Sequence, residues 1–218
     1  MGKFTLRRRR RSAERPHIPQ RADELTAAWF TEALATGSTV VDVRNHEIGV
    51  DVGFMGQVYR GHLTWDRATS TGGELPRSVV VKVPPQVPET FAAGDALRSY
   101  EREIVVYQTL RSTLGVPMPQ YFYGAMDPDP APWMQRPLLF LFDHLPVGGI
   151  NWLISQFLKV SGKSKRRYVL VIEDIADARP PTQPLGGSLD DSRASLEVVA
   201  RFLAGNCMRG EISESYPH

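Results

Sequence analysis

The chain has 218 residues, of which 42% are hydrophobic and 23% are charged, an ordinary composition for a globular protein with one domain or two small lobes. Its single cysteine, Cys207, excludes an internal disulfide framework and fits a reducing compartment, so we expect a cytoplasmic protein. No run of residues approaches the roughly 20 apolar residues of a membrane span, which excludes a transmembrane helix from this interpretation.

The formal net charge of +2 hides a strongly basic N-terminal segment. Residues 1–22 carry eight basic residues and one acidic residue, a net charge of +7, which leaves −5 for the remaining chain. The segment lacks the apolar run of a secretory signal peptide. Because like charges repel and nothing here can form a core, we predict a disordered tail over 1–22. The alternatives are a nuclear address or contact with nucleic acid or an anionic surface through five arginines, Arg7, Arg8, Arg9, Arg10 and Arg11.

The first part of the chain after the tail predicts one helix followed by strands. Apolar residues at helical spacing, with Gly37 just beyond them, predict a helix over Asp23–Thr36. The hydrophobic period then shortens to that of strands. The predicted strands are Thr39–Val43, a run near Ile48–Val52, Gln57–Trp65 and Ser78–Val83.

The second part predicts a long helix, two more strands and a final helix. An apolar stripe of 3.6-residue period predicts a helix over 96–114, and its members are Leu97, Tyr100, Ile104, Tyr107 and Leu110. Strands are predicted at Gln120–Ala125 and Tyr168–Ile172, and a helix at Asp190–Ala204. Mixed strands that feed one long helix indicate an α+β fold.

A lysine in the middle of a valine strand is the first candidate functional residue. Lys82 lies on the opposite side of its strand from Val81 and Val83, so its charge must reach water or a partner. On the predicted long helix, Glu103 is turned toward the apolar stripe, whereas Glu101 is not. A strand lysine fixed by a helical glutamate is the ion pair of protein-kinase-type folds. The alternative is a solvated edge-strand lysine.

A glycine-containing loop precedes the second strand. Gly53 and Gly56 allow the backbone to approach phosphates closely. The pattern G-x-G-x-x-G would need glycine at position 51, where the chain has Asp51, so an ordinary hairpin turn is the alternative.

Six segments in a fixed order carry a resemblance to a known family. They are Asp23–Leu34, Gly53–Arg60, Ser78–Pro84, Tyr100–Tyr107, Val116–Tyr123 and Tyr168–Ile175. In this order the chain resembles the kinase-like phosphotransferases related to aminoglycoside and choline kinases, especially the ecdysteroid-kinase-like branch. The resemblance covers about residues 23–126 and 168–204.

The resemblance implies a fold and a set of nucleotide-binding residues. Residues 23–172 would form a protein-kinase-like N-lobe, an antiparallel sheet with one long helix, and 173–218 the hinge and the start of a helical C-lobe. ATP would be the donor and a hydroxylated small molecule the acceptor. In this resemblance Lys82 is the phosphate-contacting lysine, Glu103 is its partner, and the loop of Gly53 and Gly56 covers the phosphates. The hinge that meets the adenine is Glu173, Asp174 and Ile175.

The chain also departs from this family in two ways. No histidine begins the His-Gly-Asp-x-x-x-x-Asn loop that supplies the catalytic carboxylate and ligands for Mg²⁺, so the sequence assigns no catalytic or metal-binding residue. Residues 127–167 stand where the family has a short turn and are predicted to be an insertion. We therefore expect an incomplete, inactive phosphotransferase. The alternative is a non-catalytic kinase-like binding module that uses its arginine tail.

Overall fold

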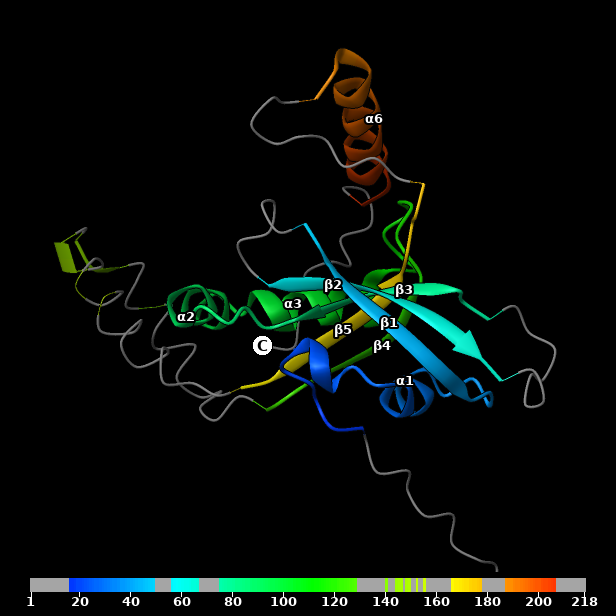
Figure 1. The fold of residues 1–218 in the computed structure, drawn as a ribbon. Coiled ribbons are helices and arrows are strands. Elements are labelled where there is room, and N and C mark those ends of the chain that lie inside the picture. The colour runs from blue at the N-terminus through cyan, green and yellow to red at the C-terminus, as the bar shows by residue number, and fades with distance from the viewer. Residues whose placement is uncertain are drawn as a thin grey trace, which may run out of the picture.

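The protein contains a five-stranded antiparallel sheet in the strand order β1-β2-β3-β5-β4 (Figure 1). The computed structural model describes residues 16–49, 56–66, 75–128, 166–177 and 187–206, and single positions between 140 and 155. The strands are β1 (Val40–Ile48), β2 (Gln57–Trp65), β3 (Ser78–Val83), β4 (Tyr121–Met126) and β5 (Tyr168–Glu173). The helices are α1 (Ala27–Leu34), α2 (Pro88–Ala96), α3 (Ser99–Val105) and α6 (Leu189–Asn206). The predicted α+β class is confirmed.

Helix α1 covers one face of the sheet. The Thr26 side chain accepts a hydrogen bond from the Trp29 backbone and begins the helix, and Ala35 in the left-handed conformation ends it. Trp29 and Phe30 are buried against the valines of β3 and β5. We call this side of the sheet the α1 face; its buried strand residues include Val79, Val81, Val83, Val169 and Val171. The predicted helix is therefore present, although shorter than 23–36.

Helix α3 covers part of the opposite face, which we call the α3 face. Its buried residues Tyr100 and Ile104 pack against Tyr168 and Leu170 of β5. Because side chains alternate along a strand, Lys82 points to this face while its neighbours Val81 and Val83 point to the other. Helices α1 and α3 thus cover opposite faces of the sheet, and each face has its own apolar core (Figure 1).

The helix predicted over 96–114 is present over Ser99–Leu110, but it begins three residues later than predicted and is preceded by helix α2, which was not predicted. The chain forms α2, turns at Arg98, whose φ is +53°, and continues as α3 and a π-helical turn over Val106–Leu110. Leu97, predicted to lie in the apolar stripe, is exposed at this turn. Helix α2 packs closely on α3 beside this turn, since a Cβ at Gly94 would overlap the Tyr100 side chain. The strand predicted at 39–43 is longer than predicted and extends to Ile48 as β1, whereas most of the run predicted near 48–52 lies outside the described residues.

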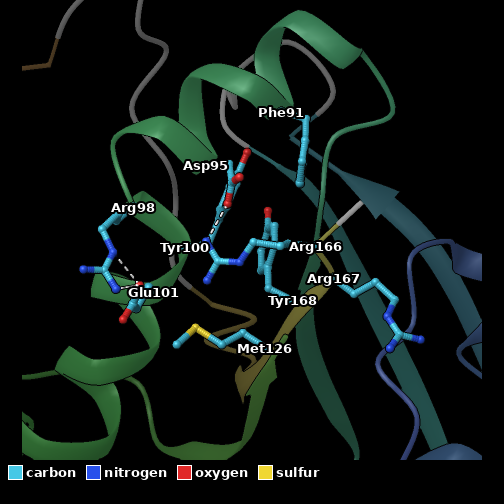
Figure 2. Close-up of a pocket in the computed structure, with 9 residues that line it drawn as sticks. All are labelled: Phe91, Asp95, Arg98, Tyr100, Glu101, Met126, Arg166, Arg167 and Tyr168. Atoms are coloured by element: carbon cyan, nitrogen blue, oxygen red, sulfur yellow. Dashed lines mark hydrogen bonds and ion pairs between the residues drawn. The ribbon is translucent and has the colours of Figure 1, made fainter. Parts of the chain in front are cut away.

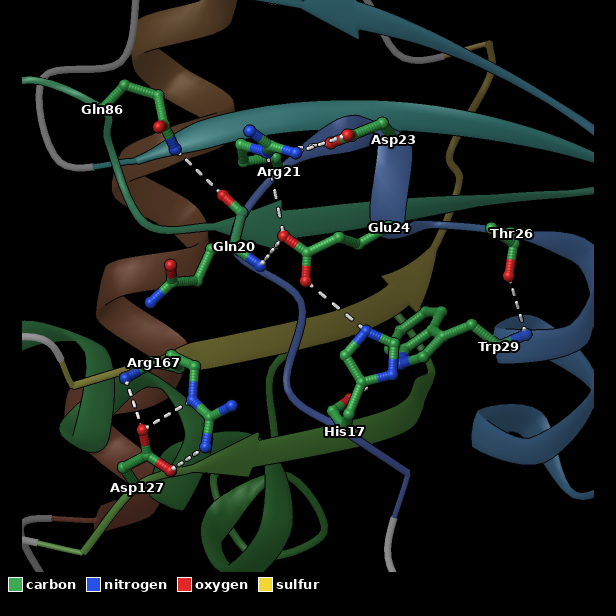
Figure 3. A network of polar contacts seen from close by, with 10 residues as sticks. All are labelled: His17, Gln20, Arg21, Asp23, Glu24, Thr26, Trp29, Gln86, Asp127 and Arg167. Atoms are coloured by element: carbon green, nitrogen blue, oxygen red, sulfur yellow. Dashed lines mark hydrogen bonds and ion pairs between the residues drawn. The ribbon is translucent and has the colours of Figure 1, made fainter.

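The described end of the predicted tail packs on the globular body. Pro19 is fully buried and Ile18 contacts the core of the α1 face. The indole nitrogen of Trp29 donates to the His17 carbonyl at 2.9 Å, and Gln86 donates to the Gln20 carbonyl at 2.9 Å (Figure 3). Residues 16–22 are therefore ordered, in contrast to the prediction of a disordered tail through residue 22. Residues 1–15, with the five arginines, lie outside the described part of the chain.

The predicted insertion leaves and re-enters the sheet at one place. Strands β4 and β5 pair directly, with Met126 opposite Tyr168. The Asp127 backbone donates to the Arg167 carbonyl, and the Asp127 carboxylate accepts from the Arg167 side chain at 2.9 Å. Residues 127 and 167 thus close a hairpin, whatever the length of the segment between them. Most of that segment lies outside the described residues.

Helix α6 is amphipathic and stands apart from the sheet (Figure 1). The predicted apolar side of this helix is present, but Leu196, Val199 and Leu203 are exposed and belong to neither core. Within the described residues no helix has both the length and the apolar character to cross a membrane.

Candidate functional site

Lys82 and Glu103 form an ion pair between the sheet and helix α3. The Lys82 Nζ lies 2.6 Å from the Glu103 Oε2. The two side chains are 25% and 33% exposed, so the pair is partly screened from water yet reachable from outside. The predicted contact is confirmed. Its geometry follows from two periodicities, because alternation turns Lys82 to the α3 face and the buried neighbour Ile104 fixes how α3 presents Glu103.

Gly56 lies directly against Lys82. A Cβ at this position would lie 3.0 Å from the Lys82 Cε and 2.8 Å from the Tyr168 hydroxyl oxygen. A larger residue would therefore displace one of these side chains, so the glycine is required by close approach. The other predicted loop glycine, Gly53, lies outside the described residues.

A stack of aromatic rings supports this position from the α3 side. The rings of Tyr168 and Tyr100 are parallel, with centroids 3.8 Å apart, and the Tyr168 hydroxyl donates to the Val83 carbonyl at 2.9 Å. Burial raises the pKa of Tyr100 to about 12, and burial also raises the pKa of Tyr168. Both tyrosines stay neutral at physiological pH, and their stacked rings support the sheet surface beside Lys82.

The three predicted hinge residues lie at the end of β5, of which Glu173 is the last residue, but they differ in what their side chains do. The Glu173 carboxylate accepts a hydrogen bond from the Gln120 backbone at 2.8 Å, which fastens it to the start of β4. The Asp174 side chain is only 1% exposed and pairs with Arg60. Ile175 is exposed. Both acidic side chains are thus engaged within the protein, and any contact with a base at this segment falls to backbone groups and to neighbours.

Arg60 was not predicted as a site residue. Its Nε lies 3.0 Å from Asp174 Oδ1 and 2.9 Å from Oδ2, and it projects from β2 onto the α3 face beside Val80. The sequence contains the alternation that places Arg60 on this face with Val58 and Lys82. It contains no signal for the pairing with Asp174, which lies 114 residues further along the chain.

A small cavity among the described residues lies elsewhere. It is lined by α2, the start of α3 and the base of the β4–β5 hairpin, and Lys82, Glu103 and Gly56 do not line it (Figure 2). Arg166 spans it and pairs with Asp95 at 2.8 Å. The cavity is therefore a feature of the hairpin base and is separate from the Lys82–Glu103 ion pair.

Comparison with known proteins found no matching family model, no matching curated protein and no matching solved structure. The functional argument therefore depends on the chemistry of the α3 face itself.

Proposed function

We propose that this chain is the nucleotide-binding part of a kinase-like small-molecule phosphotransferase, with ATP as its nucleotide and a hydroxylated small molecule as the acceptor of the family. The observation that supports this most strongly is the 2.6 Å ion pair between Lys82 on β3 and Glu103 on α3. In protein kinases the phosphate-binding lysine also lies on the third strand and is held by a glutamate of the following helix.

The chemistry of the pair suits a phosphate contact. An ammonium group has three donors, and the hydrogen bond to Glu103 uses one of them. The carboxylate fixes the direction of the lysine and leaves two donors for phosphate oxygens. Because Gly56 has no side chain, its backbone packs directly against the Lys82 side chain. The part of the site that the structure describes therefore fits a phosphate group next to Lys82.

The surface beside Lys82 suits a base. Val58, Val80 and Ile172 lie on the α3 face in adjacent strands, and all three are partly buried. Planar bases bind through apolar contact with such side chains. The expected hinge begins at Glu173, directly beyond Ile172, so its backbone is close enough to meet the edge of a base lying on these residues.

Transfer of the phosphoryl group needs residues that this sequence does not supply. None of its five histidines begins a His-Gly-Asp-x-x-x-x-Asn motif. Within the described residues, no group of three or more histidine, cysteine, aspartate or glutamate side chains could hold a metal ion, and we assign none of them to Mg²⁺. We therefore expect this chain to bind ATP without transferring its phosphate.

The test is the affinity for ATP of the purified chain and of three variants, measured with a fluorescent ribose-labelled ATP. Lys82→Met should weaken binding by about tenfold or more, because charge-assisted hydrogen bonds to phosphate are lost. Glu103→Gln should weaken it less, because the lysine stays charged but loses its fixed direction. Glu101→Gln is the matched control, since Glu101 lies on the same helix and pairs with Arg98 instead. Equal affinities in the parent chain and the Lys82 variant, or no binding at all, would contradict the proposal.

A further inference from the structure

Arg60 is a cation held at the hinge end of the α3 face. Its side chain is 28% exposed, whereas the carboxylate that it pairs with, Asp174, is 1% exposed. A buried carboxylate needs a counter-charge, and Arg60 supplies it from the solvent side. The guanidinium group therefore lies above Asp174, at the point where the chain leaves β5.

Only part of the guanidinium group is used in this contact. Both Asp174 oxygens lie within 3.0 Å of Nε, and among the described residues the two terminal nitrogens have no hydrogen bond or ion pair. A guanidinium group is planar and carries five N–H donors. The bond at Nε fixes one edge of the plane, while the rest of the group remains available to a ligand.

The distance between Arg60 and Lys82 means that the two side chains would contact different parts of one ligand. In the strand register Arg60 is opposite Val80, and Val58 is opposite Lys82, so the two cations lie two residues apart along the strands. This corresponds to about 7 Å along the sheet. The Lys82 end is where phosphates are proposed to bind, so the Arg60 end, beside Val80 and Ile172, falls under the base.

We infer that Arg60 is a base-contacting residue, whose guanidinium group, held by Asp174, stacks on the base of the nucleotide that Lys82 binds through its phosphates. This inference rests on the proposed function. Guanidinium groups stack favourably on aromatic faces, and the contact is strongest where the arginine is partly desolvated. Asp174 is then a positioning residue, which touches no ligand and acts through Arg60.

The experiment compares two ligands that differ in the presence of a base, ATP and inorganic tripolyphosphate, by isothermal titration calorimetry. Arg60→Gln should weaken ATP binding by about tenfold and leave tripolyphosphate binding within about twofold. Lys82→Met should weaken the binding of both ligands. Arg44→Gln is the matched control, because Arg44 lies on the same face of the neighbouring strand β1 but is exposed and distant from Asp174.

A second variant tests whether weaker ATP binding comes from the lost base contact or from a change in charge or folding. The double substitution Arg60→Gln with Asp174→Asn removes both charges, so the net charge is unchanged and no buried carboxylate is left unpaired. It should reproduce the selective loss of ATP binding.

The possible outcomes distinguish a failure of this inference from a failure of the proposed function on which it rests. If ATP binds, Lys82→Met weakens its binding and both Arg60 variants bind ATP as the parent does, the inference is overturned and the proposed function stands. Equal losses for ATP and tripolyphosphate in the double variant also overturn it, because they identify the pair as a structural tie. If the parent chain binds neither ligand, the proposed function and the inference fail together.

Discussion

The two faces of the sheet are built from the same strands but contain different chemistry. On β3, the valines that point to the α1 face are fully buried under helix α1, whereas Val80 and Lys82, which point to the α3 face, are only partly buried. The α1 face has an apolar core of aromatic and aliphatic side chains. The α3 face has a smaller core at β5 and leaves β2 and β3 accessible beside two ion pairs.

This difference indicates which face provides stability and which provides function. Burial of apolar surface stabilises the α1 face without any partner. The ion pairs of the α3 face, Lys82 with Glu103 and Arg60 with Asp174, contribute little or nothing beyond what apolar residues of similar volume would give. Stability therefore does not explain why a valine strand contains a lysine, whereas the proposed binding of an anionic ligand would explain it.

The largest expected effect comes from placing a charge on each face in turn. Val81→Asp would bury a carboxylate without a partner on the α1 face, at a cost of more than about 4 kcal/mol, close to the whole stability of a typical domain. Val80→Asp, one residue earlier, would place the same group on the accessible face near Arg60 and should cost less than about 1 kcal/mol. Soluble yield and urea unfolding measure both.

The Val80 variant also has a functional consequence that the Val81 variant cannot show. A carboxylate at position 80 would lie beneath the base and near the phosphates, so ATP binding should be lost while the fold persists. If the two variants are equally destabilised, the distinction between a closed and an open face is wrong.

The sequence predicted those features that depend on residues close together in the chain and missed those that depend on residues far apart. Local periodicity was sufficient for β2 to β5, for α1 and for the facing of Lys82 toward Glu103, since each depends on neighbours within one element, but it ended β1 too early. The turn at Arg98 was missed because a left-handed arginine carries no sequence signal, unlike a glycine. The pairing of Arg60 with Asp174 was missed because only the completed sheet brings these residues together.

An intermediate effect is expected from the tyrosines that support the α3 face. Tyr168→Phe removes the hydrogen bond to the buried Val83 carbonyl and should cost about 1–2 kcal/mol at neutral pH. Tyr100→Phe should cost less, because Tyr100 contributes mainly the ring that stacks on Tyr168. Urea unfolding at pH 7 measures both changes.

The same two tyrosines also predict how the free energy of unfolding changes at alkaline pH. Because burial raises the pKa of Tyr100 from 10.0 to about 12, the folded protein keeps its proton where the unfolded chain loses it. The stabilisation is fully present below pH 10 and decreases as the pH rises from 10 through about 12. Tyr100→Phe should flatten this decrease in a series of unfolding curves. An unchanged slope in that variant would show that the α3 face does not exclude water from this ring.

The smallest effect is expected from removing most of the predicted insertion, which tests whether both faces are independent of it. Among the residues that the structure describes, neither core contains one between 127 and 167, and the hairpin is already closed by Asp127 and Arg167. Replacing residues 129–165 by Asn-Gly leaves a four-residue connection between Asp127 and Arg167, a length common in hairpins. A shorter loop costs slightly less entropy to close, so the free energy of unfolding should change by no more than about 1 kcal/mol. ATP affinity should also be unchanged, since Lys82 and Arg60 lie on other strands. A loss of folding in this variant, with Asp127 and Arg167 intact, would mean that the segment covers part of the α3 face, and that this face is less open than its described residues indicate.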